Sequence, residues 1–171
     1  MLLLIAERVL AACPAPLHRT ALRMAHAVRK GWWRLYRPQL TACRVLALDA
    51  AGHVLLVRHS YGSGKWMLPG GGIKSGEDPI ASARREYAEE VGGALQGCAQ
   101  VDVTRDIFHG APSTVHVIVG LASGPVAPDR REIVVAAFHA PDALPEALAS
   151  GLAEAIPHWL ALYRADQNSS I

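Results

Sequence analysis

Residues 71–93 place five acidic side chains and Arg85 at fixed spacing behind a glycine-rich turn. Three of the acidic residues, Glu86, Glu89 and Glu90, have the spacing that puts carboxylates on one face of a helix. Like charges at this spacing destabilise a helix by a few tenths of a kcal/mol per pair. A hard divalent cation such as Mg²⁺ removes that repulsion, because it prefers oxygen ligands. The pattern therefore indicates metal binding, with a solvated acidic helix face as the alternative.

Two further residues belong to the same pattern. Arg85 is placed to hold one carboxylate by a bidentate contact and so fix its rotamer. Glu77 stands just before the acidic run and could reach the same ion. The three glycines at 70–72 allow a tight turn that brings backbone carbonyls close to a ligand.

Local signals predict the helix that positions these side chains. Asp78 is typical of an N-cap, Pro79 of a first helical turn and Gly92 of a C-terminal stop, so we expect a helix over residues 79–91. One apolar stripe of this helix should face the core. Its members are Ile80, Ala83, Tyr87 and Val91.

The whole pattern resembles the Nudix box. The matching positions are Gly71, Glu77, Arg85, Glu86, Glu89, Glu90 and Gly92, and residues 66–69 precede them as in many members of the family. Tyr87 and Gly93 stand where aliphatic residues are usual. Both are packing positions, so they bear on local rigidity and not on the chemistry.

The resemblance implies a hydrolase that cleaves a pyrophosphate bond in a nucleoside diphosphate linked to another moiety, with Mg²⁺ or Mn²⁺ as cofactor. It implies metal ligands at Glu86, Glu89, Glu90 and the carbonyl of Gly70, and catalytic roles for Glu86, Glu89 and Arg85. We expect Glu86 to accept the proton from water and Arg85 to orient it. A non-catalytic nucleotide-binding or sensor module on the same fold is the alternative, although the intact acidic set weighs against it.

The resemblance also implies an α/β fold, a Nudix-type α/β/α sandwich with a mixed sheet. We expect a helical extension over residues 1–40, the Nudix domain over 41–165 and a tail over 166–171. Apolar runs predict strands at 43–49 and 53–59, joined as a hairpin by a turn at 49–52, a short strand at 66–68, and strands at 98–108, 115–122 and 132–139. Helices are expected at 141–149 and 151–165.

Four residues outside the box are candidates for binding substrate. Arg58 and Lys65 would meet phosphates, although solvated surface charge is the alternative. Trp66 would stack on a base or belong to the core. Glu132 lies in a segment that resembles a late Nudix loop, where an acidic residue sometimes reaches the metals. The histidines lack paired spacing, so we interpret them as strand or loop residues; His116 alternates with two valines and could face the substrate cleft.

Composition limits which partners and cellular compartments remain plausible for this chain. A net charge of +2 gives no reason to expect a nucleic-acid partner, and three widely spaced cysteines suit a reducing, cytoplasmic compartment. No apolar run approaches the length of a membrane span. Basic residues around Trp32 and Trp33 fit either a helix on an anionic membrane or one packed on the domain or on a second subunit of a homodimer. A nucleoside triphosphate, an ADP-sugar and a lipid or isoprenoid diphosphate all remain open as substrates.

Overall fold

The computed structural model describes Val28 and residues 31–33, 35–108, 110–128 and 132–169. Its strands are β1 (Leu40–Leu48), β2 (Val54–His59), β3 (Ala94–Phe108), β4 (Ala111–Ser123) and β5 (Ile133–His139), and its long helices are α3 (Pro79–Val91) and α4 (Leu152–Ser169). The strands form one sheet in the order β3-β4-β1-β2-β5. Strands β1 and β4 are parallel and the other neighbours antiparallel, so the sheet is mixed, as expected.

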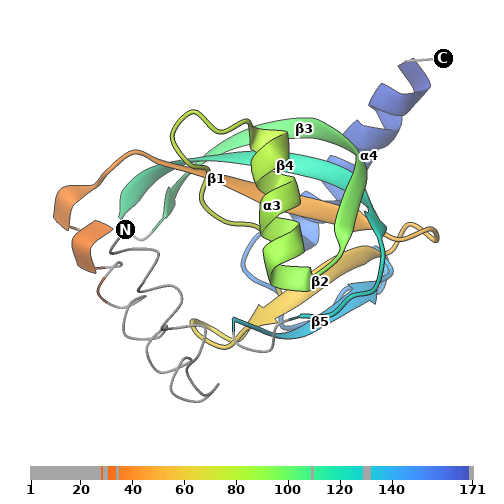
Figure 1. Ribbon diagram of the computed structural model, residues 1–171, viewed down its shortest axis with the longest axis horizontal. Helices are drawn as coiled ribbons and strands as arrows, with labels where there is room; N and C mark the ends of the chain where they lie inside the picture. The colour runs from red at the N-terminus through yellow and green to blue at the C-terminus, as the bar shows by residue number, and fades with distance from the viewer. Residues whose placement is uncertain (1–27, 29–30, 34, 109, 129–131, 170–171) are drawn as a thin grey trace.

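The two helices cover opposite faces of the sheet (Figure 1). One core cluster packs α3 against the sheet through Ala83, Tyr87 and Val91, so the predicted apolar stripe is confirmed. A second cluster packs α4 on the other face through Ile156 and Trp159. This arrangement is the expected α/β/α sandwich.

The helix that carries the acidic residues begins and ends where the sequence indicates. Asp78 is its N-cap and accepts a hydrogen bond from the backbone N–H of Ala81, Pro79 is in the first turn, and Gly92 ends the helix with a left-handed backbone. The hairpin is also confirmed, because Asp49 accepts backbone hydrogen bonds across the turn from Ala51 and His53. Both features depend on contacts between near neighbours in the chain.

Two expected elements are absent from the described residues. The helix predicted at 141–149 is wrong: the segment runs as turns, and its backbone is held by Trp66 through bonds at Ala147 and Ala149. The short strand predicted at 66–68 is reduced to single bridges, from Trp66 to Leu148 and from Met67 to Val57. In both places the backbone pairs with a segment distant in sequence, and Pro145 also interrupts the expected helix.

Most of the expected N-terminal helices lie outside the described residues, although Val28, residues 31–33 and residues 35–36 are helical. The ring of Trp33 lies 5.7 Å from that of Phe108 at the end of β3, while Trp32 is half exposed. Within the described part of the chain, no helix is both long and apolar enough to span a membrane. The boundaries at 40 and 165 stay predictions, and α4 continues through Ser169.

Candidate active site

The glycine turn lies between two strands and forms one wall of the site. The backbone N–H of Cys43 in β1 donates to the carbonyl of Gly71 at 2.9 Å, and that of Val45 donates to Pro69 at 2.9 Å. On its other side the segment pairs Met67 with Val57 of β2. The sheet thus fixes the turn beside the helix.

Two glycines of this turn lie against neighbouring atoms at distances too short for an unadjusted Cβ. Gly70 has a φ of 142°, and a Cβ there would collide with the carbonyl oxygen of Cys43. A Cβ at Gly71 would come within 2.5 Å of a carboxylate oxygen of Glu86. No side chain therefore fits at Gly70, which lies against the backbone of β1, whereas a side chain at Gly71 would have to displace the carboxylate of Glu86.

Glu90 is the most buried carboxylate of the acidic face, with only 7% of its side chain exposed. Its Oε2 accepts a hydrogen bond from the N–H of Gly70 at 3.0 Å, and its Oε1 lies 3.3 Å from Nε2 of His59. Burial raises the pKa of Glu90, and the charge of nearby Glu132 adds to that shift, while His59 and Gly70 oppose it. A buried carboxylate with so few donors around it is suited to hold a cation.

Arg85 organises the acidic residues around it. Its guanidinium makes a bidentate contact with Glu77, at 2.8 and 3.0 Å, and donates to Glu86 at 2.7 Å and to Glu89 at 3.3 Å. It also donates to the carbonyl of Gly72. The expected bidentate contact therefore exists, but its carboxylate is that of Glu77.

The carboxylates on either side of Arg85 have opposite pKa shifts. Hydrogen bonds from Arg85 hold the pKa of Glu77 at about 2. Burial raises the pKa of Glu86, with Arg85 opposing and Glu90 and Glu89 adding to the rise. Glu77 thus remains a charged structural partner of Arg85, whereas Glu86 has an increased affinity for a proton.

Two further potential metal ligands lie on the other side of Glu90. Single ligand atoms of His59, Glu90 and Glu132 all lie within 4.8 Å of one another. The pairing of β2 with β5 sets His59 opposite Ile133, next to Glu132, and the hydroxyl of Tyr61 donates to Glu132. These donors suit a divalent ion, because neutral imidazole and carboxylate are common ligands of such ions.

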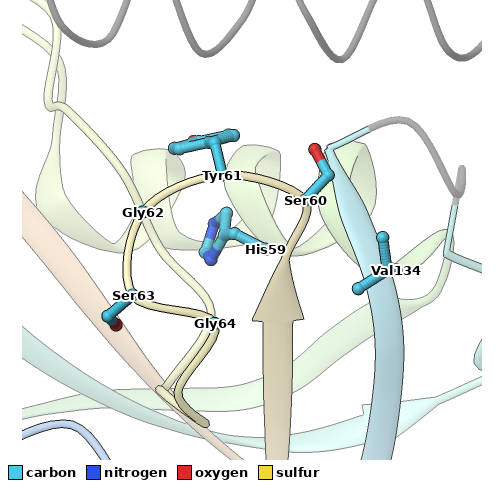
Figure 2. Close-up of a pocket in the computed structure, with 7 residues that line it drawn as sticks. All are labelled: His59, Ser60, Tyr61, Gly62, Ser63, Gly64 and Val134. Carbon is cyan, nitrogen blue, oxygen red and sulfur yellow. The ribbon is translucent and has the colours of Figure 1, made fainter.

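An open hollow of about 570 Å³ adjoins this group. It is lined by residues 59–64 and Val134 (Figure 2). Figure 2 shows the imidazole of His59 inside the loop that follows β2, with α3 behind it. The hollow offers space beside the carboxylates for a polar ligand.

The structure separates the other predicted site residues. Glu89 has 60% of its side chain exposed, on the outer side of Arg85. Arg58 lies 5.8 Å from the ring of Trp66, which packs against the core beneath α4 and so belongs to the opposite face of the sheet. Lys65 is exposed in the loop. His116, also a candidate for the cleft, lies 2.8 Å from Gln100 on β3.

His59 is the site residue that sequence reasoning missed. It ends an apolar run, and nothing in its neighbours distinguishes it from an ordinary strand histidine. Its role becomes visible only through contacts with Glu90 and Glu132, which are distant in the chain. Only the pairing of β2 with β5 shows that His59 lies beside these carboxylates.

Comparison with known proteins agrees with this geometry. The NUDIX domain family model matches residues 38–159. The RNA pyrophosphohydrolase of Rhodospirillum rubrum is 40% identical over 48 residues, which cover 28% of this chain and 29% of that protein. The match therefore spans less than a third of the curated relative.

Solved structures show the same fold. A MutT NUDIX hydrolase from Burkholderia pseudomallei aligns with a TM-score of 0.61 and 24% identity, over 66% of this chain and 92% of that one. A UDP-X diphosphatase aligns with a TM-score of 0.66 and 22% identity, over 83% and 72% of the two chains. Since the family model covers most of the sequence, the chain belongs to the NUDIX domain family.

Proposed function

We propose that this protein is a hydrolase that depends on Mg²⁺ or Mn²⁺ and cleaves a pyrophosphate bond in a nucleoside diphosphate linked to another moiety. The observation that carries the proposal is Glu90, a buried carboxylate beside the glycine turn with Glu86 on the same helix face and His59 and Glu132 opposite. These contacts bring acidic groups together at the wall of an open hollow. Two relatives named for pyrophosphate or diphosphate cleavage support the same reaction class.

The residues that would hold a divalent ion are Glu90, Glu86 and Glu132, with the Gly70 carbonyl as a further ligand. When bound, such an ion neutralises phosphate charge and lowers the pKa of an attacking water. The donor chemistry fits, because carboxylate and carbonyl oxygens are the ligands that Mg²⁺ and Mn²⁺ prefer. Exposed Glu89 would bind a second ion brought with the substrate phosphates.

Glu86 is our choice for the group that takes the proton from water. Its hydrogen bond from Arg85 fixes the direction of the carboxylate, as proton transfer from a positioned water requires. Glu77 in turn holds Arg85 through two hydrogen bonds. Catalytic geometry would therefore depend on a chain of contacts from Glu77 through Arg85 to Glu86.

The substrate phosphates would enter the hollow lined by residues 59–64, where Lys65 is close in sequence. The substrate would be a small nucleotide derivative, with a lipid or isoprenoid diphosphate as the alternative. We place the protein in the cytoplasm on the cysteine content, and contact of residues 1–40 with a membrane or a second subunit stays a prediction.

A screen of diphosphate-containing compounds with Mg²⁺ or Mn²⁺ tests the proposal. We expect at least one compound to be cleaved between its two phosphorus atoms, giving two phosphorylated products that can be identified by ³¹P NMR. Cleavage should stop when the metal is chelated. A protein that is folded and loaded with metal, yet hydrolyses nothing across nucleotide, sugar-nucleotide and lipid diphosphates, would contradict the proposal.

A further inference from the structure

We propose that His59 is a nitrogen ligand of the divalent ion and makes this centre favour Mn²⁺ over Mg²⁺; the inference rests on the metal site of the proposed function. Three separate parts of the chain supply the donors: His59 ends β2, Glu90 lies in α3, and Glu132 precedes β5. Their convergence makes a mixed nitrogen and oxygen site.

The distances suit a single ion. Adjacent ligands of an octahedral ion with bonds of about 2.1 Å are roughly 3.0 Å apart, and opposite ligands roughly 4.2 Å apart. Nε2 of His59 lies 3.3 Å from Oε1 of Glu90, close to the adjacent spacing. The three donor atoms fall within 4.8 Å of one another, so shifts of a few tenths of an ångström would bring all three to one ion.

The imidazole is held in place before any ion arrives. His59 has 11% of its side chain exposed, and its ring lies 5.2 Å from that of Tyr61. The same tyrosine donates its hydroxyl to Glu132, so one residue supports two of the donors. The ring nitrogen aimed at the carboxylates is Nε2, 3.3 Å from Oε1 of Glu90, while Nδ1 is buried on the other side and makes no hydrogen bond within the described residues.

The imidazole ligand is the reason to expect a preference for Mn²⁺ over Mg²⁺. Mg²⁺ is a hard ion that takes oxygen ligands almost throughout, and an imidazole nitrogen in its shell replaces a better oxygen donor. Among first-row transition ions, Mn²⁺ also takes mostly oxygen ligands, but it accepts an imidazole nitrogen among them more readily than Mg²⁺ does. His59 should therefore raise affinity for Mn²⁺ while contributing little to affinity for Mg²⁺.

A purely orienting role for His59 makes a different prediction. If its Nε2–H only donates to Glu90 and sets the carboxylate direction, a replacement that keeps this hydrogen bond should leave the affinities for both metals nearly unchanged. His59→Gln separates the two roles, because the glutamine amide can still donate a hydrogen bond to Glu90 but offers no imidazole nitrogen. His53→Gln is the matched control, since His53 immediately precedes β2 and lies roughly 20 Å from His59 by strand length.

The experiment uses the full chain without substrate, with Mn²⁺ as the probe. Electron spin echo spectroscopy reads nitrogen bound to Mn²⁺, and titration with competition by Mg²⁺ reads both affinities. We expect imidazole ¹⁴N coupling in the wild type and in His53→Gln, and its loss in His59→Gln. Affinity for Mn²⁺ should fall about tenfold or more in His59→Gln, and affinity for Mg²⁺ by less than about threefold.

Failure of this inference is distinct from failure of the proposed function. Mn²⁺ that binds in a manner dependent on Glu90 but shows no nitrogen coupling overturns the role of His59 alone. So does a His59→Gln variant in which the affinities for Mn²⁺ and Mg²⁺ are both unchanged or fall equally. Mn²⁺ binding that is unchanged in Glu90→Gln, or absent altogether, contradicts the metal site itself. If His59→Gln does not fold, ¹⁵N-histidine labelling of the wild type decides the question, because coupling that does not change with the label overturns the proposal.

Discussion

Replacing Glu90 by glutamine should have opposite effects on the metal-free and metal-bound protein. Glutamine has nearly the same size, and its amide oxygen can still accept the hydrogen bond from Gly70, so the packing around α3 should persist. The change removes a buried charge whose pKa is raised by burial and by nearby Glu132. It also removes a predicted metal ligand.

The expected magnitudes follow from that burial. With 7% of the Glu90 side chain exposed, loss of the charge should stabilise the metal-free protein by on the order of 1 kcal/mol, since the two hydrogen bonds already offset part of the cost of burial. This corresponds to a rise in Tm of about 2–4 °C for a chain of this size. Metal at 100 times its Kd should stabilise the wild type by about 2.7 kcal/mol, and the variant far less.

Thermal unfolding with and without Mg²⁺ or Mn²⁺ measures both effects, and product release measures turnover. We expect Glu90→Gln to melt above the wild type in chelator and below it in excess metal, and to lose at least about 100-fold in turnover. Glu154→Gln, an exposed change on α4, should behave as the wild type. Equal stabilisation of wild type and Glu90→Gln by metal would refute the reasoning.

Three further predictions concern the surroundings of the site. Arg85 lowers the pKa of Glu77 from 4.5 to about 2, so Glu77 stabilises the fold above about pH 4.5 and this contribution is lost as the pH falls toward 2. Glu77→Gln should therefore lower Tm at pH 6 and lower it by less at pH 4 and pH 3. A Tm difference between wild type and variant that stays constant with pH would contradict the ion pair. In Gly71→Ala the new Cβ should displace the carboxylate of Glu86, which should cut kcat by about 10²-fold with little change in Tm. An unchanged kcat would show that catalysis does not depend on the position of Glu86. Deletion of residues 1–38 should give a less stable, aggregation-prone domain if they pack on it, whereas a stable, active domain that no longer sediments with anionic vesicles would favour membrane attachment.

Local signals in the sequence determined α3 and its caps. Asp78, Pro79 and Gly92 act within a few residues of themselves, and the apolar stripe ending at Val91 follows helical periodicity, so both could be predicted. The grouping of Glu86, Glu89 and Glu90 on one side of the helix follows from the same periodicity. The acidic half of the site was therefore readable from sequence.

Contacts between segments distant in the chain could not be predicted from such local signals. The segment 141–149 is rich in alanine and leucine, but Pro145 at its centre disfavours a helix, and its backbone pairs with Trp66 instead. His59 meets Glu132 only through the pairing of β2 with β5, and Arg85 reaches Glu77 across the glycine turn. The burial of Glu90 and the exposure of Glu89 likewise depend on the surrounding fold.

The measurement that tests the central claim most directly is the turnover of the best diphosphate substrate as a function of Mg²⁺ or Mn²⁺ concentration. It should be made on the wild type, Glu86→Gln, Glu90→Gln and the control Glu154→Gln, with folding of each checked by its melting curve. We predict saturable activation by metal in the wild type and the control, and loss of turnover by at least about 100-fold in the two site variants at every metal concentration. Turnover close to that of the wild type in both folded site variants would contradict the account.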